Sequence, residues 1–103
     1  MKKLIFSPKA ASDIDQIYDY TEEKWGYQQA EDYVFAMRDR CHALLNGTAR
    51  GRKVGGIRSD YLALAYGSHF IIYKDGVQIY KDGVQTLTIV RILHRRMNIG
   101  AHL

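Results

Sequence analysis

The apolar positions of this chain change their period along its length and predict short strands around two helices. Residues 2–6 form a short β-prone run, which predicts a first strand. Ser7-Pro8 is typical of a helix start. A serine side chain accepts a hydrogen bond from a free backbone N–H of the first turn, and proline has no backbone N–H that would need a partner there. The helix is predicted to end at Gly26. Its buried face is predicted to consist of Ala11, Ile14, Ile17, Tyr18, Thr21 and Trp25, with Asp13, Asp15, Asp19, Glu22 and Glu23 on the other faces.

A second amphipathic helix is predicted from about Gln28 to Leu45. Asn46-Gly47 suits its end, since these residues adopt the left-handed conformation that closes many helices. The short connection at residues 25–27 predicts an antiparallel helical hairpin. The apolar stripe of this helix, interpreted as core, consists of Ala30, Tyr33, Val34, Met37, Cys41, Leu44 and Leu45.

The second half of the chain reads as strands. They are predicted at Ile57–Tyr66, His69–Tyr73 and Thr86–Leu93, with Gly67-Ser68 as a tight turn. The short connections favour an antiparallel meander with the helical hairpin packed on one face. The predicted fold is therefore α+β, a single domain over residues 1–103 in the order β-α-α-β-β-β, with the N-terminal strand and helical hairpin packed on an antiparallel sheet.

A near-perfect tandem repeat interrupts this pattern, because residues 73–79 are followed at once by a second copy, residues 80–86. Each copy contains an Asp-Gly turn signal, although one turn suffices to reverse the chain. Seven is odd, so an extended insertion would move every later side chain to the opposite face. We therefore expect a lengthened hairpin or bulged loop whose tip is long, mobile or present in two registers. The alternative is a duplication tolerated at a loop tip without a function of its own.

Composition and charge narrow the classes of function. The 103 residues carry a net charge of +4, which divides into −2 over residues 1–49 and +6 over residues 50–103. A basic half suggests nucleic acid, a nucleic-acid machine or an acidic protein as partner. With one cysteine, Cys41, and no apolar run of membrane-spanning length, we expect a cytoplasmic protein that does not enter membranes.

The last strand breaks into a basic cluster, residues 91–96. Strict alternation puts Leu87, Ile89, Arg91 and Leu93 on one face and Thr88, Val90, Ile92 and His94 on the other. Arg58 and Arg91 could then converge on the exposed side of the sheet, or each could extend to solvent or pair with Asp60. Phosphodiester cleavage would need an acid–base group and a cationic stabiliser, roles open to His94, Arg91 and Arg58. The histidines lack metal-ligand spacing, so neither a metal nor another cofactor is expected.

The ordered set of motifs resembles the ParE branch of the ParE/RelE toxin superfamily. The matching residues are Ser7-Pro8-Lys9-Ala10, Asp13-Ile14, Ile17-Tyr18-Asp19-Tyr20, Trp25-Gly26, Ile57-Arg58, residues 67–73 and residues 89–98. The resemblance implies the toxin of a type II toxin–antitoxin pair that inhibits DNA gyrase, through its A subunit, and is neutralised by a ParD-like antitoxin. It implies a binding protein rather than an enzyme, without sequence-specific DNA binding of its own.

The superfamily leaves two alternatives open. RelE-like members cut mRNA on the ribosome, often with a tyrosine near the C-terminal end, where this chain has Ile99. A third possibility is an inactive interaction module that still binds antitoxin. The resemblance suggests a target-binding set of Arg91, His94, Arg95, Arg96 and Met97. The antitoxin-binding set that we expect is Tyr18, Trp25, Tyr33, Met37 and Arg58.

Overall fold

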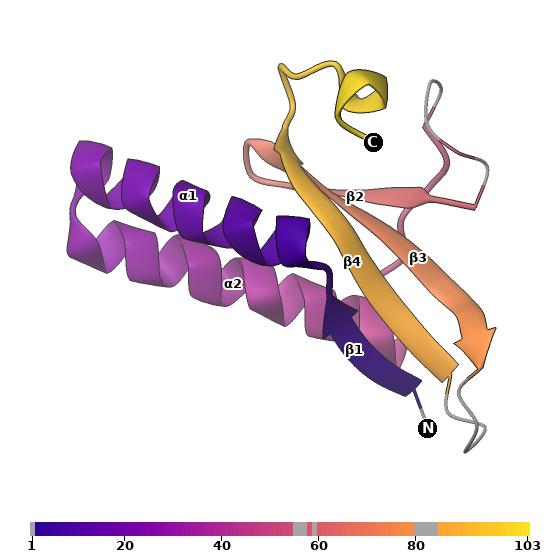
Figure 1. Cartoon of the computed structure of the whole chain (residues 1–103). Helices are drawn as coiled ribbons and strands as arrows, with labels where there is room; N and C mark the ends of the chain where they lie inside the picture. Colours follow the sequence, from indigo (N-terminus) through magenta and orange to yellow (C-terminus); the bar gives the residue numbers. More distant parts are fainter. Residues whose placement is uncertain (1, 55–57, 59, 80–84) are drawn as a thin grey trace.

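A computed structural model describes residues 2–54, 58, 60–79 and 85–103 of the chain (Figure 1). The elements follow the predicted order, with one short 3-10 helix added near the C-terminus. They are β1 Lys2–Phe6, α1 Pro8–Trp25, α2 Tyr27–Asn46, β2 Leu62–Tyr66, β3 His69–Ile79, β4 Gln85–His94 and η1 Ile99–His102. Both predicted helices are confirmed to within a residue at each end. Neither is long and apolar enough to cross a membrane, within the described ranges.

The four strands form one sheet in the order β1-β4-β3-β2. The predicted meander is confirmed, since β2 pairs antiparallel with β3 and β3 antiparallel with β4. β1 lies parallel beside β4, so the whole sheet is mixed rather than antiparallel. The two helices lie side by side on one face, and the tip of their hairpin projects beyond the sheet (Figure 1).

The start of α1 is fixed to β4 as well as capped. Ser7 Oγ accepts a hydrogen bond from the Ala10 amide at 3.0 Å and donates one to the Val90 carbonyl at 2.7 Å. Gly26 follows the last residue of α1, and Gly47 closes α2 in the left-handed conformation at φ 85°. The predicted cap residues are therefore confirmed, and the serine cap also sets where the hairpin sits on the sheet.

A β-bulge in β4 overturns the strict alternation predicted for this strand. Ile72 pairs with Arg91 but the next residue, Tyr73, pairs with Ile89, so β4 contains one extra residue, Val90. Beyond the bulge the faces exchange. Ile92 joins Leu87 and Ile89 in the helix-facing core, whereas Leu93 belongs to a smaller cluster on the opposite face.

β2 begins at Leu62, and the described residues just before it, Arg58, Asp60 and Tyr61, are not in a strand. Ile57, where this strand was predicted to begin, lies outside the described residues. Arg58 lies outside the strand, where its guanidinium pairs with Asp60 at 3.4 Å and stacks over the Tyr61 ring. Arg58 and Arg91 therefore do not converge. The alternative of a pair with Asp60 is confirmed for Arg58, whereas Arg91 pairs with Asp13. The glycine-containing connector before β2 is anchored in part, since the Gly51 amide donates to Tyr73 Oη at 2.7 Å.

The first repeat copy extends β3 as far as Ile79. Residues 80–84, on which the lengthened tip was placed, lie outside the described residues. Gln85 and Thr86, at the end of the second copy, pair with β1. The regular pairing of β3 with β4 runs from His69–His94 to Asp75–Leu87, and the register shifts between Asp75 and Ile79. The strand pairs in the middle of the sheet therefore lie outside the register shift.

Deleting residues 74–80 is expected to leave the fold and its stability intact. The remaining copy restores the same residue types beside Tyr73 and keeps the pairings of β1 with Gln85 and Thr86. A shorter connection costs less closure entropy, so the free energy of unfolding should stay equal or rise by about 1 kcal/mol. Urea unfolding measures this. A loss of more than about 2 kcal/mol would show that the seven additional residues contribute native contacts that a single copy cannot replace.

Candidate functional site

A groove of about 860 Å³ lies where the outer part of the helical hairpin meets the end of β4. Its lining comes from α1, the first half of α2, the turn between β2 and β3, the end of β4 and the C-terminal residues. The residues that line it are Asp13, Gln16, Ile17, Tyr20, Thr21, Lys24, Trp25, Gln29, Tyr33, Ser68, His69, Arg91, Ile92, Leu93, His94, Met97 and His102. A groove of this size and mixed apolar and polar character suits a protein segment.

Large apolar side chains stand exposed around this groove. Tyr20, Trp25 and Met97 are 61%, 63% and 45% exposed. Trp25 was predicted as core, but it occupies the last turn of α1, which projects beyond the sheet and is not covered by any of the four described strands. Exposed aromatic and methionine side chains grouped at a groove are typical of protein-binding surfaces.

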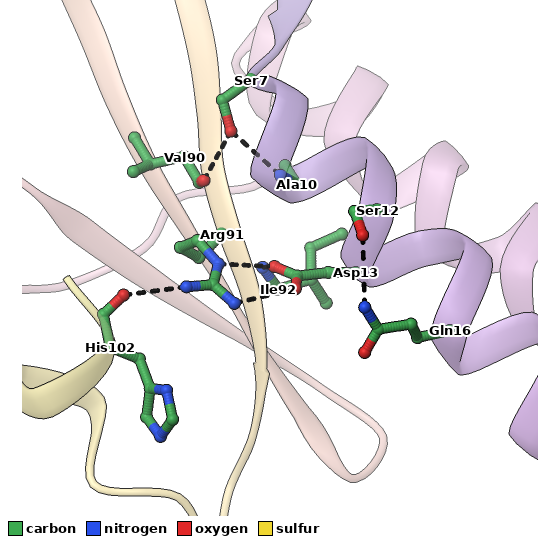
Figure 2. A network of polar contacts seen from close by, with 9 residues as sticks. All are labelled: Ser7, Ala10, Ser12, Asp13, Gln16, Val90, Arg91, Ile92 and His102. Atoms are coloured by element: carbon green, nitrogen blue, oxygen red, sulfur yellow. Dashed lines mark hydrogen bonds and ion pairs between the residues drawn. The ribbon is translucent and has the colours of Figure 1, made fainter.

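The floor of the groove contains a buried ion pair between α1 and β4. Asp13 accepts hydrogen bonds from Arg91 Nε at 2.8 Å and Nη2 at 2.9 Å, and its Oδ2 also accepts from the Ile92 amide at 2.9 Å (Figure 2). The Asp13 and Arg91 side chains are 10% and 18% exposed. Hydrogen bonds to this carboxylate raise the pKa of Arg91. The remaining guanidinium nitrogen, Nη1, donates to the His102 carbonyl at 2.9 Å.

Asp13 is the important residue that sequence reasoning missed, because it was assigned to an exposed face. The face that is buried consists of Ala10, Asp13, Ile14, Ile17 and Thr21. Asp13 stands three residues after Ala10 and four before Ile17, on the helix stripe itself. That spacing was a usable signal, since a carboxylate on a buried stripe requires a cationic or N–H partner.

A second polar cluster joins α2 to the ends of β3 and β4. Tyr33 Oη lies 2.7 Å from His69 Nδ1 and accepts a hydrogen bond from the Ser68 amide at 3.1 Å. The His69 ring packs edge-on against His94, with ring centres 5.4 Å apart. The Tyr33 hydroxyl can accept from Ser68 and donate to His69 at the same time. Donation to His69 requires that Nδ1 of this histidine carries no proton.

The pKa of His69 is lowered to about 4, chiefly by burial and next by the neighbouring His94, with Asp13 acting in the opposite direction. The unfolded chain therefore takes up this proton at higher pH than the folded one. Stability is fully present above about pH 6.5 and is lost as the pH falls toward 4.

We expect this loss to amount to about 2 kcal/mol, a value discounted because the ring is partly exposed. His69→Gln should flatten the dependence of unfolding free energy on pH between about 6.5 and 4. The matched control His42→Gln, at an exposed position of α2, should retain the wild-type dependence of unfolding free energy on pH. Equal slopes in the two variants would show that His69 is not the group responsible.

The predicted target-binding residues fall into two groups. Arg95, Arg96 and Met97 follow β4 directly and are exposed. His94 is half-buried, and Arg91 is engaged by Asp13. Three of the five side chains are thus presented to solvent together, while Arg91 serves the fold.

The predicted antitoxin-binding residues are more scattered. Trp25 and Tyr33 line the groove. Tyr18 is half-buried and donates to Glu31 at 2.9 Å, which links the two helices. Met37 is fully buried in the core and has no surface to offer a partner, which corrects its assignment. Arg58 is exposed but belongs to the loop before β2 and does not line the groove.

The three residues considered for a nuclease, His94, Arg91 and Arg58, are not brought together at the groove. Arg58 is absent from the groove lining, and the guanidinium of Arg91 is occupied by Asp13. Within the described part of the chain, no group of three histidine, cysteine or acidic residues is placed to bind a metal. Cys41 is buried, and burial raises the pKa of its thiol to about 12, which makes it a core residue rather than a nucleophile.

Known toxins are similar to this chain in sequence and fold. Residues 4–99 match the family described as "ParE toxin of type II toxin-antitoxin system, parDE". Toxin ParE1 of Caulobacter vibrioides is 33% identical over 103 residues, covering 100% of this chain and 99% of the relative. Toxin ParE1 of Mycobacterium tuberculosis H37Rv is 34% identical over 104 residues, covering 98% and 97%. A solved structure titled "Chromosomal ParDE TA system from P. aeruginosa" has a TM-score of 0.72 at 21% identity, covering 91% of this chain and 96% of that one.

Proposed function

Because this chain belongs to the ParE family of type II toxin–antitoxin toxins, we propose that it arrests growth by inhibiting DNA gyrase in the cytoplasm. We propose further that a ParD-like antitoxin neutralises it by binding the groove. In this account the toxin is a binding protein, not an enzyme, and its partner on gyrase is the A subunit.

The observation that carries the gyrase proposal is the exposed basic and apolar segment after β4. Arg95, Arg96 and Met97 directly follow the end of β4 and are exposed. Among the described lining residues the single carboxylate is Asp13, and Arg91 already neutralises it. The segment after β4 is therefore cationic beside the groove, and it suits an anionic site of a nucleic-acid enzyme.

The antitoxin proposal rests on the apolar residues at the same groove. Trp25, Tyr20 and Met97 could receive the apolar side chains of a partner helix. Lys24 and the basic segment would pair with acidic residues around them. One bound antitoxin segment could then cover both the groove and the gyrase-binding surface, which explains neutralisation by steric exclusion.

Trp25→Ala is expected to weaken antitoxin binding by about 30-fold, because buried tryptophans at interfaces contribute about 2 kcal/mol or more. Titration calorimetry with the antitoxin of the same operon measures the change. Phe35→Ala, at a 75% exposed position of α2 that does not line the groove, is the matched control and should bind normally. Equal losses in the two variants would place the interface elsewhere.

Expression in growing cells tests the function as a whole. Induction of the wild-type chain should stop growth and cause chromosomal breaks, while bulk mRNA stays intact. Coexpression of the operon's antitoxin should restore growth. Growth arrest with mRNA cut on the ribosome and unbroken DNA would instead identify a RelE-like nuclease.

A further inference from the structure

The sheet face turned away from the helices has a small apolar cluster of its own. Its buried centre is Ala63, Ile72 and Leu93, and the residues packed against it are Val54, Tyr61, Phe70, Val90 and Ile99. None of the large apolar side chains that are exposed in the described part of the chain is a member of this cluster. The cluster therefore fills this face without offering an apolar anchor to a partner.

Arg52 stands on this face because residues 50–54 run along the outer edge of β2. The Arg52 amide donates to the Ala63 carbonyl at 3.0 Å, and the Ala63 amide donates to the Arg52 carbonyl at 3.0 Å. Side chains directly opposite each other in such an antiparallel bridge lie on the same side of the sheet. Gly51 permits the close approach, since a Cβ there would lie 2.7 Å from both the Ala63 carbonyl oxygen and Tyr73 Cε1. Arg52 is thus carried by an anchored backbone.

Two further arginines stack on aromatic rings of the same cluster. The guanidinium carbon of Arg58 lies 5.3 Å from the centre of the Tyr61 ring. That of Arg95 lies 5.3 Å from the centre of the Phe70 ring. Both distances are within the range of a cation–π contact, and both arginines are exposed. Each guanidinium therefore borders the cluster and remains accessible to solvent.

A lysine joins these arginines, and one carboxylate opposes the set. Lys74 is the second residue after Ile72 in β3, so alternation puts it on the same face. Asp60 lies 3.4 Å from Arg58 Nε and 3.6 Å from Lys74 Nζ. Beyond residue 39 the other side-chain carboxylate of the described chain is Asp75, which is in an ion pair elsewhere. Four cations against one carboxylate leave this face with a surplus of three positive charges.

We propose that this basic face, formed by Arg52, Arg58, Lys74 and Arg95, binds the phosphate backbone of duplex DNA without reading its sequence. Cations that lack an apolar anchor suit a polyanion, because phosphate contacts gain affinity from charge and counterion release. A protein partner instead needs buried anchors of the kind that the groove offers. Three of the four cations are arginines, whose planar guanidinium pairs with two phosphate oxygens.

The basic face is separate from the groove, since none of its four cations lines the groove. Figure 1 shows the connector from α2 reaching β2 on the side of the sheet away from the tip of the helical hairpin. Duplex DNA is the favoured polyanion because it carries one charge per about 1.7 Å of its axis, a higher density than a single strand has.

Fluorescence anisotropy of a labelled duplex of about 20 base pairs, titrated with the full-length chain between about 50 and 200 mM salt, tests the proposal. The wild type should bind with a slope of about −3 in log affinity against log salt, since each phosphate contact contributes about −0.9. Arg52→Gln/Arg58→Gln should reduce that slope by about 2 and weaken binding about 10-fold or more at the lowest salt. The matched control Arg38→Gln/Arg40→Gln removes the same charge from exposed positions of α2 and should bind normally.

A second measurement needs no variant. Adding the duplex to the ¹⁵N-labelled wild type should shift the amide resonances of residues 52–54 and 70–74 and leave those of the two helices in place. Absence of binding at about 50 mM salt, equal losses in the two double variants, or shifts confined to the groove would overturn the proposal.

Two comparison ligands test the class of polyanion. One strand of the duplex and a polyglutamate of similar length should both bind more weakly than the duplex. Equal affinity for the single strand would overturn the assignment to duplex DNA, and equal affinity for polyglutamate would assign the face to an acidic protein. Neither gyrase nor antitoxin is present, so these results do not depend on the proposed function.

Discussion

Asp13→Asn is expected to lower the free energy of unfolding by about 3–5 kcal/mol, because it leaves the Arg91 guanidinium partly buried without its counter-charge. The asparagine amide oxygen can accept at most two of these hydrogen bonds and its NH2 group would face the third donor, whereas the carboxylate accepts all three. Urea unfolding at neutral pH measures the loss. Asp15→Asn, at an exposed position of the same helix, should stay within about 0.5 kcal/mol of the wild type.

A double-mutant cycle separates the ion pair from ordinary packing. Asp13→Leu and Arg91→Met should each be strongly destabilising alone, because each leaves its partner unpaired. Together they should be less destabilising than the sum by about 2 kcal/mol or more, since neither charge then remains. Additive losses would show that the two side chains act independently and that the groove floor does not depend on their pairing.

The second large effect is expected at the exposed basic segment. The double substitution Arg95→Ala/Arg96→Ala should weaken gyrase inhibition by about 100-fold, because arginines at a protein interface often contribute 1–2 kcal/mol each. The toxin concentration that inhibits supercoiling of plasmid by half measures the effect.

The matched control is Arg38→Ala/Arg40→Ala, which removes two exposed arginines from α2 and leaves the same net charge. This control should inhibit gyrase normally, and thermal unfolding should confirm that both variants are folded. Full inhibition by the Arg95/Arg96 variant would remove the segment after β4 from the target-binding surface.

Much of the fold could be predicted from the sequence because its signals are local. The three- and four-residue steps, Ser7-Pro8, Gly26 and Asn46-Gly47 define two helices within a residue of their observed ends. The Gly67-Ser68 turn and the meander were predicted correctly for the same reason. The parallel pairing of β1 with β4 was not specified, since it joins the two ends of the chain.

The errors come from contacts between distant segments. The bulge at Val90 lies against the first turns of α1, where Ser7 Oγ donates to the Val90 carbonyl and Asp13 accepts from the Ile92 amide. The sequence of β4 contains no periodic pattern that predicts the bulge. One extra residue moves each later side chain of the strand to the opposite face of the sheet. Trp25 was placed in the core by spacing alone, although it is 63% exposed in the last turn of α1, near the tip of the hairpin.

The candidate site was found in part. The basic cluster drew attention to residues 94–97, and Trp25 and Tyr33 do line the groove. Spacing could not show that Arg91 is held by a helix residue 78 positions away, or that Arg58 pairs locally with Asp60. Met37 was misassigned because a helical stripe does not by itself say which of its members reach the surface.

The most direct test of the account is a plasmid cleavage assay with purified gyrase, ATP and the folded toxin. The account predicts that linear DNA accumulates in proportion to added toxin, only when gyrase is present, and that the operon's antitoxin abolishes it. Intact plasmid at saturating toxin, from protein shown to be folded, would contradict gyrase as the target.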